Sequence, residues 1–94
     1  MQVGRVIGKI WATRKEESLG GLKMLIVKPI NYLDEVQNNA PVIAADIIGA
    51  GVGEIVLLVS GSSARTAVGD MTIPIDTAVI AIVDDKEIDS NLIT

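Results

Sequence analysis

Short apolar runs separated by turn-forming residues constrain the fold of this chain more than any other feature of its sequence. In residues 1–13 both charged side chains fall on odd positions, which fits the period-two alternation of a β-strand. Arg5 and Lys9 share the odd face, so we expect the small apolar even face, with Gly4 and Gly8, to point inward. Short strands joined by glycine bends are typical of a small all-β barrel.

Four more strands complete the expected fold, in a single domain over residues 1–94. These strands are expected over residues 22–30, 42–48, 55–60 and 77–83. Turns and loops are expected over residues 14–21, 31–41, 49–54, 70–76 and 84–87, with an edge strand or a tail over residues 88–94. The run 55–60 is apolar almost throughout, which predicts burial on both of its faces.

One short helix is expected after the strand that ends at residue 60. Either Ser62 or Ser63 can cap its first turn, because a serine hydroxyl accepts from the free N–H groups there. The helix is expected to continue through Ala67, with Gly69 placed to end it.

The composition predicts self-association. A chain of 94 residues hides only roughly 60 to 65% of its unfolded surface on folding. With 49% hydrophobic residues, it carries more apolar surface than a small monomer easily buries. No apolar run approaches the ~18 residues that span a bilayer, and the first residues do not resemble a signal peptide. We therefore expect a cytoplasmic protein without membrane contact.

Charge and residue types argue against several function classes. A net charge of −4 disfavours nucleic acid as a partner, because nonspecific affinity for phosphates needs clustered Lys and Arg. With no Cys and no His, the chain lacks disulfides, the usual zinc ligands and the side chain that titrates near neutral pH. An acidic run at residues 84–89 lacks the spacing of a calcium loop and is interpreted as a solvated turn. We expect no catalytic residue, metal ion or cofactor.

The glycine cluster at residues 49–54 resembles a ligand loop but fails the known patterns. It does not follow G-x-G-x-x-G, it lacks the G-K-[ST] ending of a P-loop, and it leads into a strand instead of a helix. The favoured interpretation is a tight turn whose glycines supply positive φ or let another backbone approach closely. The alternative is a small barrel that binds a ligand or single-stranded nucleic acid through this loop.

The Gly61–Arg65 segment offers a second candidate site. A nucleophilic Ser62 or Ser63 would need a lysine or carboxylate as base, because the chain has no histidine. This enzyme hypothesis is less favoured than a small barrel that binds a ligand. Arg65 follows a buried strand and is expected to pair with a carboxylate, for which Glu54, Asp46 and Asp76 are the candidates. Trp11 is expected to fill a gap or to pack at an interface.

Three ordered motifs resemble the bacterial microcompartment vertex proteins, the EutN/CcmL family. They are Gly-Ala-Gly-x-Gly-Glu at 49–54, Gly-Ser-Ser-Ala-Arg at 61–65 and Ile-Val-Asp at 82–84. The resemblance covers nearly the whole chain. Further matching positions are Met1, Val6, Gly8, Thr13, Lys15, Leu19, Gly21, Lys23, Leu25, Val27, Asp46, Val56 and Asp76. Trp11 and Met24 replace ordinary aliphatic residues, and Ile55 replaces a tryptophan common in the family.

The resemblance implies a five-stranded barrel, related in shape to oligonucleotide-binding (OB) folds, that forms a cyclic pentamer. Such pentamers are noncatalytic and cap the vertices of a polyhedral shell, beside hexagonal tile proteins in the bacterial cytoplasm. Ser63, where carboxysome members often have alanine, favours a metabolic organelle of the ethanolamine, propanediol or glycyl-radical type. Carried over by position, subunit contacts or pore surroundings are expected at Gly49, Ala50, Gly51, Gly53, Glu54, Gly61, Ser62, Ser63, Ala64 and Arg65.

Overall fold

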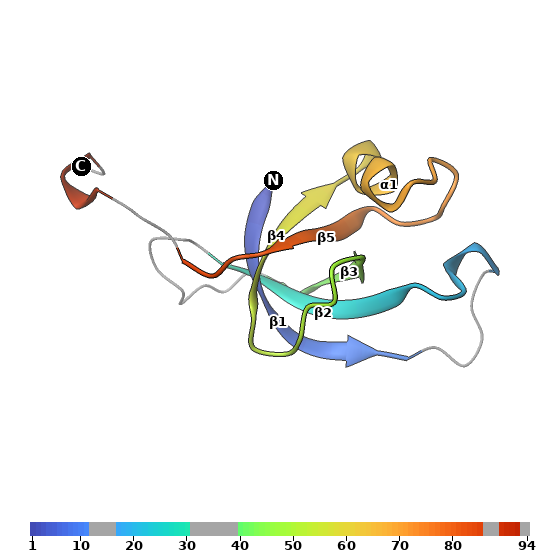
Figure 1. The fold of residues 1–94 in the computed structure, drawn as a ribbon, viewed down its shortest axis with the longest axis horizontal. Coiled ribbons are helices and arrows are strands. Elements are labelled where there is room, and N and C mark those ends of the chain that lie inside the picture. The colour runs from blue at the N-terminus through green and yellow to red at the C-terminus, as the bar shows by residue number, and fades with distance from the viewer. Residues whose placement is uncertain (12–16, 31–39, 86–88, 93–94) are drawn as a thin grey trace.

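The protein is a closed β-barrel with one short helix at its side, in a computed structural model that describes residues 1–11, 17–30, 40–85 and 89–92 (Figure 1). The order of the strands around the barrel is β1-β2-β3-β5-β4. The elements are β1 (Gln2–Ile10), β2 (Lys23–Ile30), β3 (Val42–Asp46), β4 (Ile55–Ser60), α1 (Ser62–Val68), β5 (Thr77–Ile82) and the 3₁₀ turns η1 (Glu17–Leu19) and η2 (Ser90–Leu92). The expected five-stranded all-β barrel with one short helix is confirmed.

Most strand pairs are antiparallel, and one parallel pair closes the barrel. β1 pairs antiparallel with both β2 and β4, β2 with β3, and β4 with β5. β3 and β5 run parallel, and only Ala45 opposite Ala78 and Asp46 opposite Val79 join them. The closure therefore depends on a much shorter ladder than the β1–β2 pair, which aligns seven residue pairs.

A bulge in β1 decides which side chains point inward. Gly4 and Val6 are buried, as expected for the even face, and a Cβ at Gly4 would lie 2.5 Å from Cγ1 of Val27. The β1–β2 register then shifts between Val6 and Gly8. Beyond the shift Gly8 lies opposite Ile26, which is on the outer face of β2. The expected inward orientation is wrong for Gly8, because an extra residue in a strand reverses the facing of those that follow.

The barrel interior is filled by aliphatic side chains from all five strands. Burying one Val or Leu side chain contributes about 1.5 to 3 kcal/mol, so this cluster supplies most of the driving force for folding. Its members are Val6, Leu25, Val27, Ala44, Ala50, Val56, Leu58 and Val79.

A second apolar cluster lies outside the barrel. The segment between α1 and β5 contributes Ile73 and Ile75, which cluster with the buried Ala45 of β3. Partly buried residues packed against it are Leu19, Leu22, Met24 and Val68. This packing keeps the α1 region against the β2–β3 side of the barrel.

The end of β3 and the burial of β4 differ from the sequence-based expectation. β3 ends at Asp46 instead of continuing through residue 48, because the Asp46 side chain bonds to the backbone that follows. β4 is not buried on both faces, since Val56 and Leu58 are buried while Leu57 and Val59 remain partly exposed.

The 3₁₀ turn η2 lies away from the barrel, so the described residues 89–92 form a tail and not an edge strand (Figure 1). The molecule measures 49 × 23 × 22 Å along its principal axes. Residues 14–16, 31–39, 86–88 and 93–94, on which other predicted turns and tail residues fall, lie outside the described residues. Within the described ranges, no helix is long and apolar enough to cross a membrane.

Candidate functional site

Two carboxylates hold the loop that connects β3 to β4. Asp46 Oδ1 accepts from the backbone N–H groups of Ile48 and Gly49, and its Oδ2 accepts from Ala50, each at 3.0 Å. Glu54 Oε1 accepts from the N–H of Gly51 at 2.6 Å. Four consecutive amides of the loop are thus occupied by the chain's own side chains.

The same loop is attached to β1. The N–H of Gly53 donates to the carbonyl of Val6 at 2.8 Å, and the N–H of Val6 donates to the carbonyl of Glu54 at 2.9 Å. Arg5 Nη1 donates to the carbonyl of Gly53 at 2.9 Å. Ala50 is only 1% exposed and belongs to the interior cluster, so the loop covers one end of the barrel.

The expected roles of the loop glycines are confirmed for two of the three. Gly49 and Gly53 have φ values of 91° and 94°, a region that side chains other than hydrogen rarely adopt. Gly51 does not have positive φ; a Cβ there would instead lie 3.3 Å from Oε1 of Glu54. The close neighbour of Gly51 is therefore a side chain of its own loop and not another backbone.

The outer surface of this loop is apolar. Ile47, Ile48 and Val52 are 43%, 45% and 59% exposed, and residues 47–53 include no charged or polar side chain. We call these three side chains the loop face. Because the amides that would hold an anionic ligand already bond to Asp46 and Glu54, the geometry disfavours the ligand-binding alternative.

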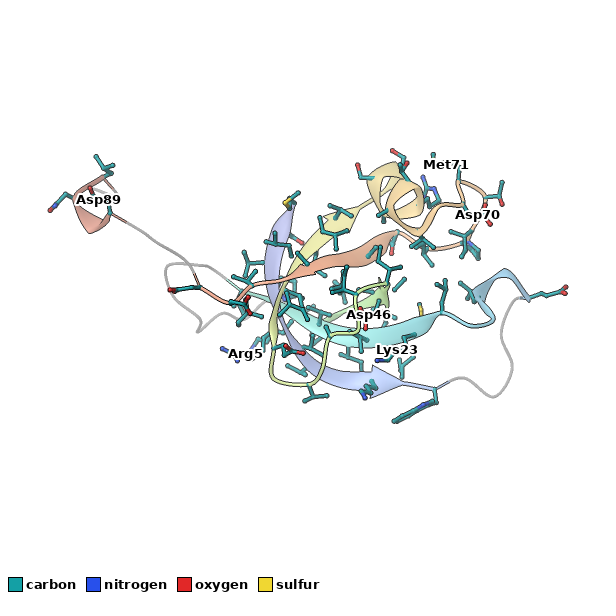
Figure 2. The ribbon with its side chains drawn as sticks, in the orientation of Figure 1. Arg5, Lys23, Asp46, Asp70, Met71 and Asp89 are labelled. Atoms are coloured by element: carbon teal, nitrogen blue, oxygen red, sulfur yellow. The ribbon has the colours of Figure 1, made fainter. Side chains whose placement is uncertain are left out.

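The buried Asp46 also lies near a cation. Lys23 Nζ is 3.8 Å from Asp46 Oδ2, with the Lys23 side chain 53% exposed and that of Asp46 fully buried (Figure 2). The pair forms where the first residue of β2 lies opposite the last residue of β3. No local sequence pattern indicates this contact, because it depends on the register between two strands.

The corner between β4 and α1 does not use a serine cap. Gly61 is the N-cap residue, with φ 66° and ψ −138°, and no side-chain hydrogen bond caps the helix. Ser62 and Ser63 lie inside α1 and are exposed, so the expected serine cap is wrong. The N–H of Gly61 instead donates to the carbonyl of Asp76 at 2.7 Å, which anchors the corner to the start of β5. The expected helix end at Gly69 is confirmed.

Arg65 stabilises this corner without an ion pair. Its Nη1 donates to the backbone carbonyl of Ile75 at 3.1 Å, and among the described residues it forms no salt bridge with Glu54, Asp46 or Asp76. The predicted carboxylate partner is therefore wrong. Asp46 and Glu54 bond to their own loop, at the opposite end of β4 from Arg65.

A shallow open hollow of about 360 Å³ lies beside α1. We call it the helix groove, and its lining residues are Val59, Ser62, Ser63, Thr66, Ala67 and Ile80. None of these residues is charged, so the groove offers no base that could activate either serine. Ala64, on the inner side of the same helix, is fully buried and attaches the groove to the barrel.

The two predicted segments do not form one site within a subunit. The 49–54 loop precedes β4 and the 61–65 corner follows it; in Figure 1 the loop passes below the barrel and α1 lies above it. Sequence reasoning missed Ile47 and Ile48 as surface residues because it assigned them to a strand. Trp11 is 86% exposed, so it does not fill a gap within the subunit.

The acidic side chains do not gather into a metal site. In the part of the chain that the structure describes, no group of three or more His, Cys, Asp or Glu side chains could hold a metal ion. The pKa of Asp70 is lowered because the Thr72 hydroxyl and N–H both donate to its Oδ1, at 2.6 and 2.9 Å. These bonds lie within an exposed turn between α1 and β5, where they hold the shape of the turn.

Known proteins similar to this chain belong to one family. Residues 1–84 match the family described as "Ethanolamine utilisation protein EutN/carboxysome". The microcompartment shell vertex protein GrpN of Rhodospirillum rubrum is 41% identical over 87 residues, covering 93% of this chain and 97% of that protein. The carboxysome shell vertex protein CcmL of Thermosynechococcus vestitus is 40% identical over 95 residues, covering 99% and 93%. The two kinds of relative are therefore equally close.

The fold is shared with solved structures as well. A structure titled as the GrpN pentameric microcompartment shell protein from Rhodospirillum rubrum superposes with a TM-score of 0.84 at 39% identity. The match covers 95% of this chain and all of that one.

Proposed function

The chain belongs to the EutN/CcmL family, and from that premise we propose that it is a noncatalytic shell protein whose cyclic pentamers cap the vertices of a polyhedral bacterial microcompartment. The observation that carries the proposal is the match over residues 1–84 to a family whose similar members are named as shell vertex proteins. The similar GrpN shell protein is described as pentameric, which supports five as the number of subunits.

The physical role follows from geometry. Flat sheets of hexagonal tiles do not close, so five-fold units enter where the shell curves. A cyclic ring repeats one heterologous interface until it closes, and this interface buries surface that one subunit leaves exposed. The apolar side chains of the loop face, and the outer side of β4, are surface of this kind.

The partners of the pentamer in this proposal are further copies of the chain and the hexagonal tile proteins of the same shell. Its location is the shell, within the bacterial cytoplasm. Ser63 favours a metabolic organelle over a carboxysome as its setting, although relatives of both kinds are equally similar overall. The absence of any charged group in the helix groove supports a structural rather than a catalytic use of its serines.

Native mass spectrometry tests the ring directly. We expect a species of five times the chain mass, and a monomer at all protein concentrations would contradict the proposal. The vertex role is tested by expressing tile proteins with and without this chain. Closed polyhedra are expected only when the chain is present, and complete closure without it would contradict a vertex function.

A further inference from the structure

The outer side of the sheet formed by β1, β2 and β3 is apolar along one row of paired residues. Gly8 of β1 lies opposite Ile26 of β2, which lies opposite Ile43 of β3 (Figure 1). Ile26 and Ile43 alternate with the interior residues Leu25 and Ala44, so both point outward. A Cβ at Gly8 would lie 3.4 Å from Cδ1 of Ile26, so the absence of a side chain there lets Ile26 lie across β1.

Two large apolar side chains adjoin this row at the end of β1. Ile10, the last residue of β1, is 40% exposed, and Trp11 directly after it is 86% exposed. We call Gly8, Ile10, Trp11, Ile26 and Ile43 the sheet face. Exposed apolar side chains gathered on one surface mark an interaction site, and tryptophan is enriched among the residues that dominate binding energy.

Cationic side chains flank the sheet face. Lys9 lies between Gly8 and Ile10 in β1, and Lys28 shares the outward side of β2 with Ile26, two residues along the strand. Neither β1 nor β2 contains an acidic residue. Neither lysine forms an ion pair with another described residue. Both ammonium groups are therefore available to carboxylates from outside the subunit.

The division of charge along the chain indicates what fits this surface. Residues 1–30 hold six of the eight Lys and Arg residues but two of the twelve Asp and Glu residues, a formal charge of +4, and residues 31–94 carry −8. Two copies that met through their sheet faces would bring lysines against lysines. A nucleic acid would stack on a single ring and be repelled by the acidic remainder of the chain. A short acidic protein segment avoids both penalties.

We propose that the sheet face binds an acidic segment of a partner protein, in which aliphatic side chains lie between carboxylates. The aliphatic side chains cover Trp11, Ile26 and Ile43, and the carboxylates pair with Lys9 and Lys28. The row across three strands spans about 10 Å, which an extended segment of about three residues covers. This binding goes beyond the proposed function and does not require the ring.

The fluorescence of Trp11 tests the proposal, because it is the chain's one tryptophan. The probe is a synthetic peptide without aromatic residues, in which leucines lie between glutamates. The full chain is expected to show a saturable shift of its emission to shorter wavelength as Trp11 leaves water. A peptide with the same leucines between lysines is the matched control and is expected to bind about tenfold less tightly. Equal affinities for the two peptides would overturn the proposal.

Substitutions separate the apolar and cationic parts of the surface. Ile43→Glu is expected to weaken binding of the acidic peptide by about tenfold, and its 40% exposure leaves the barrel interior intact. Lys9→Glu is expected to weaken binding of the acidic peptide and to strengthen binding of the lysine peptide. Leu92→Glu, at an 82% exposed position on η2, adds a carboxylate away from the barrel and is expected to bind like the parent.

Circular dichroism verifies that each variant keeps the fold. If Ile43→Glu and Lys9→Glu are folded and both bind the acidic peptide like the parent, the sheet face is not its site. If Ile43→Glu does not fold, Lys9→Glu decides alone, since its side chain is exposed.

A single-stranded oligothymidylate tests the other class of ligand. We expect it to leave the Trp11 emission unchanged, and tighter binding of the oligonucleotide than of the acidic peptide would overturn the proposal. Native mass spectrometry measures the number of subunits independently of these titrations. A pentamer that does not bind the acidic peptide would disprove this inference alone, and a monomer that binds it would disprove only the ring.

Discussion

Asp46 connects the sequence to the shape of the β3–β4 loop through three backbone hydrogen bonds. Its carboxylate ends β3, turns the chain and satisfies donors that would otherwise need water. Sequence reasoning gave Asp46 a structural role only as a possible partner for Arg65. The error arose because an aspartate that bonds to nearby backbone and an aspartate that pairs with a distant arginine look alike in a sequence.

Replacing Asp46 tests the role of these bonds. Asp46→Asn is expected to destabilise the fold by about 2 to 3 kcal/mol, because an amide nitrogen cannot accept from the N–H groups that one carboxylate oxygen now serves. Lys23→Met is the control and is expected to cost about 0 to 1 kcal/mol, since the Lys23 side chain is 53% exposed. Urea unfolding at one fixed protein concentration measures both. Equal losses would mean that the ion pair, and not the backbone bonds, holds the loop.

Asp70 gives a residue-level prediction for pH. Its pKa is lowered by the Thr72 hydroxyl and N–H, so the carboxylate's contribution to stability is present above the unfolded pKa. That contribution is lost as the pH falls through the lower pKa of the folded state. Thr72→Val removes the hydroxyl bond and is expected to raise the Asp70 pKa, as measured by carboxyl-carbon NMR titration. Thr66→Val, which loses a hydroxyl bonded to Met71, should leave the Asp70 titration unchanged.

At the level of elements, local patterns predicted the strands well. Residues 22–30 and 77–83 were expected as strands and nearly coincide with β2 and β5, because apolar runs and flanking turns are local signals. The facing of Gly8 was not predictable, since the bulge in β1 exists only in relation to β2. The partner of Arg65 likewise depends on where the α1–β5 segment lies in space.

The start of α1 gives a prediction that runs against usual helix capping. A serine at the N-cap normally stabilises a helix, but Gly61 has φ 66° and ψ −138°, a region available almost only to glycine. Gly61→Ser is therefore expected to cost roughly 1 to 3 kcal/mol. Ser62→Ala, at an exposed position within α1, is expected to stay within about 0.5 kcal/mol of the parent. A more stable Gly61→Ser variant in urea unfolding would show that the corner can adopt ordinary capping geometry.

For the whole molecule, the sequence predicted the barrel and its family. It did not predict that the two candidate segments, 49–54 and 61–65, lie at opposite ends of β4. Both glycine-containing segments were predicted as subunit contacts or pore surroundings, which remains a prediction. A linear sequence does not show that β4 separates them, or that one exposes apolar side chains and the other borders a hollow. Those properties depend on the direction in which β4 crosses the barrel.

The short β3–β5 ladder has a consequence for how the barrel opens. Two residue pairs join these strands, against seven between β1 and β2, so the cylinder has one narrow seam. Amide protons bonded across the seam are expected to exchange with deuterium well before those shared by β1 and β2, and uniform protection around the sheet would contradict this. We therefore expect the barrel to open first at this seam, ahead of the longer β2–β3 and β4–β5 ladders on either side of it.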